Sequence, residues 1–231
     1  GQANNPLSTA LAKAGWSVAL VEREHVGGTC INEGCTPTKT MIASARVAHM
    51  ARRGDDYGVR TGSVRVDLTR VRERKRSIVD QFRTGSRQRL EGAEGVDLLM
   101  GEGCFTGPRS VDVLMRDGST RHLTADRIFI NAGQRPRHPN LPGLDEVPSL
   151  NSTTVMELGE VPEHLLVLGG GYVGVEFGQM FHRFGSDVTI VQRSGQVLSH
   201  EDADIAEKVI EILRDDGVEV LLDTDALQVS E

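Results

Sequence analysis

The sequence predicts an α/β fold in which one supersecondary unit occurs twice. Residues 1–23 align without a gap on residues 171–193, at a constant offset of 170. Before the second copy, an apolar run from Leu165 to Leu168 leads into a glycine-rich turn. A strand, a glycine turn, a helix and a second strand in this order are typical of Rossmann-like dinucleotide-binding domains. We therefore expect two such domains, both incomplete in this sequence.

The second copy carries the stronger nucleotide-binding signal. Its turn reads GGGYVG from Gly169 to Gly174, and a predicted helix and a strand from Val188 to Val191 follow. Such glycines let a pyrophosphate approach the helix N-terminus. The alternative is a glycine-rich connection that binds no nucleotide. We expect the nucleotide at Gly169, Gly170, Gly171, Tyr172, Val173 and Gly174, and a buried helix face made of Val173, Phe177, Met180, Phe181 and Phe184.

The first copy begins inside the equivalent turn, at Gly1. Trp16 to Val21 reads as its strand, and Glu22 ends that strand about 20 residues past the turn, where an acid binds the ribose of a dinucleotide. Asn4 stands at the third glycine position, which normally allows close packing of helix and strand. We expect the sequence to be a piece of a longer protein. The predicted apolar face of the intervening helix is Leu7, Ala10, Leu11 and Ala14.

A close pair of cysteines follows the first copy. Cys30 and Cys35 lie in the run GGTCINEGCTPTK, with no leader-like segment before them, so a redox or metal-binding pair is favoured over a structural disulfide. No further Cys or His lies at zinc-ligand spacing, so no metal site is expected. A disulfide requires the chain to bend between the two residues, and Gly34 permits that bend. The alternative is two small buried residues in a turn.

A helix is predicted directly after the second cysteine. Thr36 reads as its N-cap and Pro37 as its first residue. Cys35 would then lie against the helix N-terminus, with Lys39 one turn further along. The helix dipole and the ammonium both favour a thiolate over a thiol. We therefore expect a reactive sulfur at Cys35.

Composition makes several functions improbable. The 231 residues carry a net charge of −7, and no apolar run approaches the ~20 residues of a membrane span. We therefore expect neither nucleic-acid nor membrane partners. Residues 70–89 are locally basic, but we interpret these charges as the solvated face of a helix. Its predicted apolar stripe is Leu68, Val71, Ile78, Val79 and Phe82. Cys104 stands alone in a strand-like region, where we expect it to be buried by packing.

Three segments, in this order, resemble a known family. They are the cysteine run from Gly27 to Lys39, NAGQRP from Asn131 to Pro136, and GGGYVGVE from Gly169 to Glu176. The chain resembles the flavin-dependent pyridine nucleotide-disulfide oxidoreductases along its whole length. The resemblance implies that FAD and NAD(P) are the cofactors. It also implies a relay in which hydride passes from the reduced nicotinamide to FAD, and the flavin then reduces a Cys30–Cys35 disulfide.

The resemblance also implies a role for each site residue. Cys35 would be the sulfur next to the flavin, and Cys30 the thiol that meets the substrate. Lys39 would lie near the flavin and pair with Glu176, and these four residues would be catalytic. The residues expected to contact cofactors in or near the first domain are Gly1, Glu22, Arg23, Gly27, Gly28, Thr29, Cys30, Lys39, Gly103, Ala132, Gly133, Gln134 and Glu176.

The resemblance further implies an FAD-binding domain over residues 1–147 and an NAD(P)-binding domain over residues 148–231. The full-length protein is expected to be a cytoplasmic homodimer that acts on a small-molecule or disulfide substrate, with its acid–base residues outside this sequence. Within the family, the segment from Thr36 to Thr40 (TPTKT) resembles the mercuric-reductase-like flavoproteins. Dihydrolipoamide dehydrogenase is the alternative. A non-catalytic nucleotide-binding fragment is an alternative of another class.

The end of the second strand in the second copy predicts the choice of nucleotide. Gln192 stands where NAD-dependent members usually have an acid, so no carboxylate there would repel a 2′-phosphate. Arg193 follows, and its guanidinium can form a charge-assisted hydrogen bond to phosphate. We therefore expect a preference for NADPH. The alternative is that Arg193 is an ordinary exposed arginine.

Overall fold

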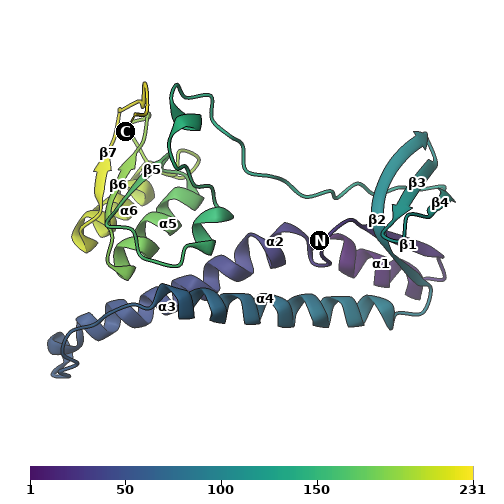
Figure 1. Cartoon of the computed structure of the whole chain (residues 1–231), viewed down its shortest axis with the longest axis horizontal. Coiled ribbons are helices and arrows are strands. Elements are labelled where there is room, and N and C mark those ends of the chain that lie inside the picture. The colour runs from purple at the N-terminus through teal and green to yellow at the C-terminus, as the bar shows by residue number, and fades with distance from the viewer. Residues whose placement is uncertain (231) are drawn as a thin grey trace. The chain divides into compact units, whose positions relative to one another are not determined.

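The computed structural model describes residues 1–230, which form two compact units (Figure 1). The first contains Gly1–Pro37 and Arg76–Arg135, and the second contains Thr38–Lys75 and residues 136–230. Both are α/β, which confirms the predicted fold class. These units are defined by contacts between residues and not by a bound cofactor. The division into an FAD-binding and an NAD(P)-binding domain therefore stays a prediction. None of the helices in the described part of the chain has the length and apolarity needed to cross a membrane.

The first unit is built on a four-stranded sheet in the order β1-β2-β3-β4. β1 (Val18–Glu22) runs parallel to β2 (Val96–Gly107), as in a βαβ unit. β2 then continues into an antiparallel extension with β3 (Ser110–Met115) and β4 (Thr120–Thr124). The sequence analysis predicts the strand β1 and a strand around Cys104, but not this antiparallel extension.

The helix α1 (Asn4–Lys13) packs on β1 and β2, as the first copy of the repeat predicts. Its predicted face is wrong in part, because Leu7 and Leu11 are half-buried but Ala10 and Ala14 are exposed, and the buried side chain is Ser8. The Ser8 hydroxyl donates to the carbonyl of Asn5 at 2.9 Å, so this polar side chain is satisfied inside its own helix. A hydroxyl with a local partner can therefore be buried where the apolar pattern does not predict it.

The second unit contains a three-stranded parallel sheet in the order β5-β6-β7. Its strands are β5 (His164–Leu168), β6 (Asp187–Val191) and β7 (Glu219–Leu221). The helix α5 (Tyr172–Phe184) connects the first two strands, and α6 (Ala203–Asp216) connects the last two (Figure 1). This is the predicted order of strand, turn, helix and strand, continued by a second helix and strand.

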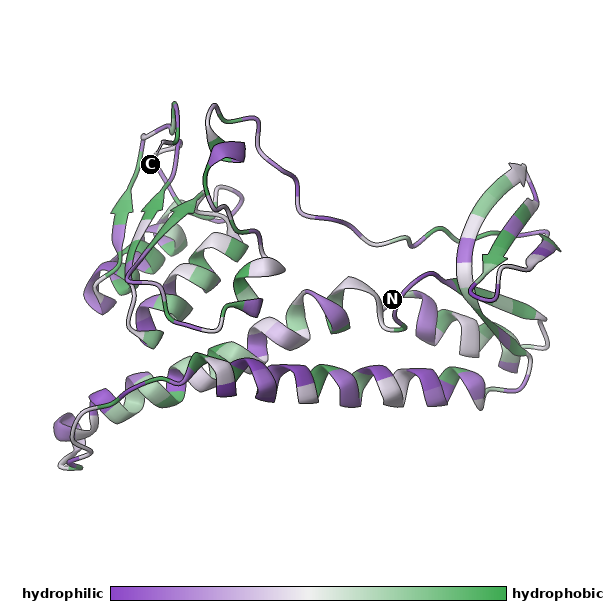
Figure 2. Ribbon diagram, in the orientation of Figure 1, coloured by the Kyte–Doolittle hydropathy of each residue, from purple (hydrophilic) through white to green (hydrophobic). Residues whose placement is uncertain are grey.

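The core of the second unit lies between this sheet and its helices, and Figure 2 shows β5 and β6 as largely hydrophobic. Phe181 and Phe184 of α5 meet edge to face, with ring centroids 5.8 Å apart. Four predicted residues of the helix face are buried, namely Phe177, Met180, Phe181 and Phe184. Val173 is an error of the prediction, since its side chain is 55% exposed. It lies in the first turn of α5, next to the glycine turn.

Two long helices, α3 (Cys35–Arg52) and α4 (Leu68–Glu91), contribute residues to both units. α4 covers the predicted basic helix and buries Leu68 and Val79. Phe82, predicted in the same stripe, is 54% exposed. The remaining elements are α2 (Gly28–Asn32) and the 3-10 helices η1 (Gly54–Tyr57), η2 (Leu144–Glu146) and η3 (Thr154–Glu157).

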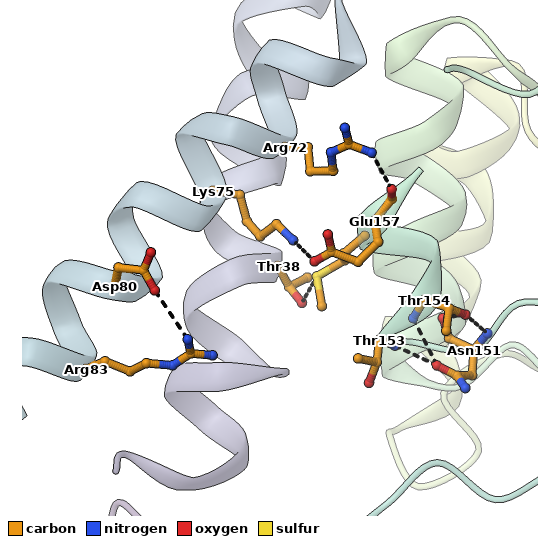
Figure 3. A network of polar contacts seen from close by, with 10 residues as sticks. Thr38, Arg72, Lys75, Asp80, Arg83, Asn151, Thr153, Thr154 and Glu157 are labelled. Atoms are coloured by element: carbon orange, nitrogen blue, oxygen red, sulfur yellow. Dashed lines mark hydrogen bonds and ion pairs between the residues drawn. The ribbon is translucent and has the colours of Figure 1, made fainter. Parts of the chain in front are cut away.

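A buried lysine takes a place on the inner side of α4 that the apolar pattern does not predict. Lys75 is only 3% exposed, and its ammonium donates to the carboxylate of Glu157 at the end of η3 (Figure 3). Arg72 donates to the backbone carbonyl of Glu157 at 2.7 Å, and the Thr38 hydroxyl of α3 lies 3.7 Å from the sulfur of Met156. These contacts tie α3 and α4 to η3 within the second unit.

We expect Glu157→Ala in the full-length protein to lower the free energy of unfolding by about 1–3 kcal/mol, because the buried ammonium of Lys75 loses its carboxylate. Lys75→Met keeps the length of the side chain and removes the charge, and it should cost less than about 1 kcal/mol. The double variant should therefore be more stable than Glu157→Ala alone. Urea unfolding measures all three variants. Additive losses in the double variant would show that the two side chains are not coupled.

Candidate active site

The two cysteines lie on either side of a bend. Cys30 is in α2, the chain turns at Glu33 and bends at Gly34, and Cys35 is the first residue of α3. A Cβ at Gly34 would lie 3.1 Å from the carbonyl oxygen of Thr29 and 3.4 Å from the Cα of Cys30. Glycine is therefore favoured there by the close approach of the two helix ends. Both cysteines are free thiols, with Cys30 half-buried and Cys35 exposed.

The two thiols interact. The pKa of Cys30 is raised above its ordinary value, first because its thiol hydrogen-bonds to Cys35 and second because it is partly buried. A thiol–disulfide exchange pair needs two cysteines that the backbone brings together, and the bend at Gly34 does so here.

The helix after the bend starts earlier than predicted. α3 begins at Cys35, two residues before the predicted first residue Pro37. Proline is tolerated at this point, because the first N–H groups of a helix have no partner within it. Cys35 is therefore part of the first turn of α3, at the positive end of the helix dipole.

The predicted partner of Lys39 is confirmed. The ammonium of Lys39, one turn along α3 from Cys35, pairs with the carboxylate of Glu176 on α5. The two side chains are 59% and 37% exposed, so solvent weakens the pair and its contribution to stability is small. It does hold the lysine at a fixed position on the surface of the second unit. The catalytic role of both residues stays a prediction.

Three segments of the first unit meet around the start of α2. A Cβ at Gly28 (φ 65°) would lie 2.6 Å from the Cα of Gly1, and a Cβ at Gly133 (φ 78°) would lie 2.8 Å from the hydroxyl oxygen of Thr29. The backbone N–H of Gln134 donates to the same hydroxyl at 3.4 Å. The three segments therefore pack so closely that no side chain fits at Gly28 or Gly133.

The other residues that the resemblance assigns to FAD are spread over several elements of the first unit. Glu22 ends β1 and accepts a hydrogen bond from the N–H of Glu24 at 2.9 Å. Arg23 forms surface ion pairs with Glu24 and Glu102. Gly27 precedes α2 and has φ of 114°. Gly103 lies in β2 beside Val21, and Ala132, directly before Gly133, is exposed.

The glycine turn of the second unit has the geometry of a pyrophosphate site. Gly169 has φ of 103°, which only glycine adopts readily. A Cβ at Gly171 would meet no atom within 4 Å, so the turn is open at the helix N-terminus. A Cβ at Gly174 would lie 2.0 Å from the carbonyl oxygen of Gly169, so α5 packs directly on the turn. The three glycines therefore serve a tight turn, an open approach and close packing, as a bound pyrophosphate requires.

Comparison with known proteins decides the family. The model of the pyridine nucleotide-disulphide oxidoreductase family matches residues 1–231. The chain belongs to this family. Pyridine nucleotide-disulphide oxidoreductases use FAD and NAD(P)H, which agrees with the predicted cofactors.

The chain is 38% identical over 204 residues to a mercuric reductase of Bacillus cereus, a match that covers 88% of this chain and 32% of that protein. It is 31% identical to a dihydrolipoyl dehydrogenase of Bacillus subtilis (strain 168), over 91% of this chain and 46% of that protein. Among solved structures, the Cu(II) complex of the HOCl-induced flavoprotein disulfide reductase RclA from Escherichia coli matches with a TM-score of 0.85 and 36% identity, covering 100% of this chain and 49% of that chain. The chain thus spans about a third to a half of these relatives.

In this member of the family, side chains from three segments surround the second glycine turn. Tyr172, the first residue of α5, donates its hydroxyl hydrogen to the carboxylate of Glu201. Gln192 follows β6 and turns its side chain toward the glycine turn. Arg193 is exposed, and within residues 1–230 no hydrogen bond or ion pair of its side chain is found. Glu201 is not among the predicted site residues, because nothing in the local sequence links it to a tyrosine 29 positions earlier.

The prediction for the third cysteine, Cys104, is right about its strand and wrong about its burial. Cys104 lies in a strand, as predicted, but it is exposed. It sits in the antiparallel part of β2, opposite Asp112, where its neighbours Gly103 and Phe105 are exposed too. In the described part of the oxidoreductase chain, no three side chains among His, Cys, Asp and Glu gather as a metal site would require.

Proposed function

We propose that the full-length protein is an FAD-dependent pyridine nucleotide-disulfide oxidoreductase that passes electrons between NAD(P)H, FAD and the Cys30–Cys35 pair. The observation that carries this proposal is the bend at Gly34, which brings Cys30 of α2 close to Cys35 at the start of α3. The two sulfurs can exist as a dithiol or as a disulfide, so the pair can hold two electrons.

The residues of this chain fit both cofactors. Gly28, Thr29 and Gly133, which the family resemblance assigns to FAD, lie together in the first unit, and FAD supplies two-electron chemistry when it is bound. The open turn at Gly171 offers the N-terminus of α5 to a nucleotide pyrophosphate. Lys39 lies one helical turn along α3 from Cys35 and pairs with Glu176, as the family resemblance implies for the catalytic residues.

As the substrate we propose a soft metal ion that binds thiolates, as in a mercuric-reductase-like flavoprotein. The segment from Thr36 to Thr40 and the similarity to a mercuric reductase support this choice. RclA, whose structure is that of a Cu(II) complex, also supports it. A dihydrolipoamide substrate is the second candidate, favoured by the similarity to a dihydrolipoyl dehydrogenase.

The test follows NADPH oxidation by the purified, FAD-loaded full-length protein. With Hg(II), one NADPH should yield Hg(0), NADP⁺ and a proton. With Cu(II), one NADPH should reduce two ions to Cu(I). We expect at least one metal ion to be turned over faster than lipoamide. Faster turnover of lipoamide would support the second candidate, whereas no NADPH oxidation with any acceptor would favour a non-catalytic nucleotide-binding protein.

The choice of nucleotide is proposed to rest on Arg193, which is exposed at the end of β6. A charge-assisted hydrogen bond from its guanidinium to the 2′-phosphate would favour NADPH over NADH by roughly 10- to 150-fold. Arg193→Ala should remove most of this preference, measured as the ratio of kcat/KM for the two nucleotides. Lys208→Ala removes an exposed positive charge from α6 of the same unit and should leave the ratio unchanged. An unchanged ratio in Arg193→Ala would eliminate Arg193 as the selector.

The assembly and location of the full-length protein also remain proposals. We infer a homodimer in the cytoplasm, on the strength of the family resemblance alone. Sedimentation of the purified full-length protein tests the dimer, and fractionation of the cells that produce it tests the location.

A further inference from the structure

Gln192 occupies the position that a ribose-binding acid takes in NAD-dependent relatives, yet its side chain is fully engaged within the protein. Its carbonyl oxygen accepts a hydrogen bond from the backbone N–H of Gly170 at 2.9 Å. Its amide nitrogen donates to the carbonyl of Gln196 at 3.1 Å and to the hydroxyl of Ser194. A side-chain amide offers two donated hydrogens and an acceptor oxygen, and all of these functions are in use.

The orientation of this amide is set by its neighbours. The N–H of Gly170 can only donate, so it must face the oxygen of Gln192. The carbonyl of Gln196 can only accept, so it must face the nitrogen. Rotating the amide by 180° would bring two donors together at Gly170 and two acceptors together at Gln196. The side chain is therefore held in one orientation.

Gly170 is enclosed by the same loop. Its carbonyl accepts a hydrogen bond from the N–H of Leu198 at 2.8 Å, and a Cβ on Gly170 would lie 2.8 Å from a methyl carbon of Val197. Val197 is 0% exposed. The loop after β6 thus closes the back of the glycine turn, while the front at Gly171 stays open. Gln192 supplies the bond that satisfies the buried N–H of the turn.

We propose that Gln192 is a positioning residue that braces the pyrophosphate-binding turn through Gly170 and takes no part in choosing between NADPH and NADH. The proposal rests on the proposed nucleotide site of the second unit. Because the pyrophosphate is common to both nucleotides, loss of the brace should weaken both by the same factor. Selection at the 2′-position is then left to Arg193.

The test uses Gln192→Leu and Gln192→Asn in the full-length, FAD-loaded protein. Gln192→Leu leaves the buried N–H of Gly170 unpaired, so we expect the Kd values for NADPH and NADH to rise together by roughly 5- to 150-fold. Gln192→Asn adds no charge, but its amide is one carbon shorter and cannot reach Gly170 and Gln196 together. Both Kd values should again rise together. In each variant the ratio of the two Kd values should stay within about twofold of the wild-type ratio.

Hydrogen exchange gives a readout that needs no nucleotide. The amide of Gly170 should exchange at least about tenfold faster in Gln192→Leu than in the wild type, while amides in β6 keep their rates. Ser194→Ala removes one partner of the Gln192 amide but leaves the bond to Gly170, and it should leave this exchange slow.

Two results would overturn the inference. One is a shift of the Kd ratio toward NADH by about tenfold or more in the uncharged variant Gln192→Leu, which would make Gln192 a selector. The other is unchanged exchange at Gly170 in Gln192→Leu, which would show that the brace is not needed. Failure of the proposed function looks different, because the wild-type protein would then bind neither nucleotide although Gly170 is still protected.

Discussion

Serine at either Cys30 or Cys35 is expected to lower turnover of the full-length protein by about 1,000-fold or more. Each variant leaves a single sulfur at the bend, so no disulfide can form and the pair can no longer hold two electrons. Residues that act as one unit lose most of their rate effect when one member is removed. The measurement is NADPH oxidation with the best acceptor found. Cys104→Ser is the matched control, because Cys104 is exposed on β2 and outside the pair, and its activity should be unchanged.

Loss of Cys35 should also change the reactivity of the remaining thiol, Cys30. In a Cys104→Ser background, Cys35→Ala should lower the pH at which Cys30 reacts with iodoacetamide, because the hydrogen bond to Cys35 is the main cause of the raised pKa of Cys30. The rate of alkylation of Cys30 against pH, with and without Cys35, measures the change. An unchanged profile would show that the two thiols do not interact.

Substitutions at two glycines of the turn, Gly174 and Gly171, should have different effects, the first on folding and the second on nucleotide binding. Gly174→Ala places a methyl group 2.0 Å from the carbonyl oxygen of Gly169, with backbone on both sides, so α5 must move away from the turn. We expect a loss of about 3 kcal/mol or more in unfolding free energy. Urea unfolding of the full-length protein measures it. A loss below about 1 kcal/mol would mean that the turn yields easily.

Gly171→Ala is the matched control for folding and the test of the nucleotide site. Gly171 has φ of −75° and ψ of 178°, which alanine adopts without strain, and its Cβ would meet no atom within 4 Å. Stability should therefore change by no more than about 0.5 kcal/mol. The methyl group would occupy the open side of the turn, so KM for NADPH should rise by roughly tenfold or more. Unchanged binding would place the pyrophosphate elsewhere.

Sequence periodicity predicts which segments fold into which elements, but it predicts less well what each side chain touches. The repeat predicts α1, β1, α5 and β6, and the apolar spacing of α5 identifies four of its buried residues. The structure confirms the pairing of Lys39 with Glu176, but only the family resemblance makes this pairing predictable. No local pattern links residues 137 positions apart.

The errors concern the burial of single side chains. Lys75 can be buried because Glu157 pairs with it, and Ser8 can be buried because its own helix accepts its hydroxyl hydrogen. Phe82 and Cys104 are exposed although both are residue types that proteins usually bury. Burial of a polar side chain depends on a partner distant in the sequence or on a local bond. Neither is visible in hydrophobic spacing alone.

The two units interleave along the chain, which limits how the protein can be recombined with its relatives. Residues 38–75 of the second unit are inserted between the two segments of the first. Exchange of one complete unit for that of a relative therefore needs junctions near residues 37, 75 and 135, two of which fall inside the helices α3 and α4. A single crossover near residue 135 would carry the glycine turn and Arg193 together, but it would combine residues 38–75 of one parent with residues 136–230 of the other, so the contact of Lys75 with Glu157 would join two parents.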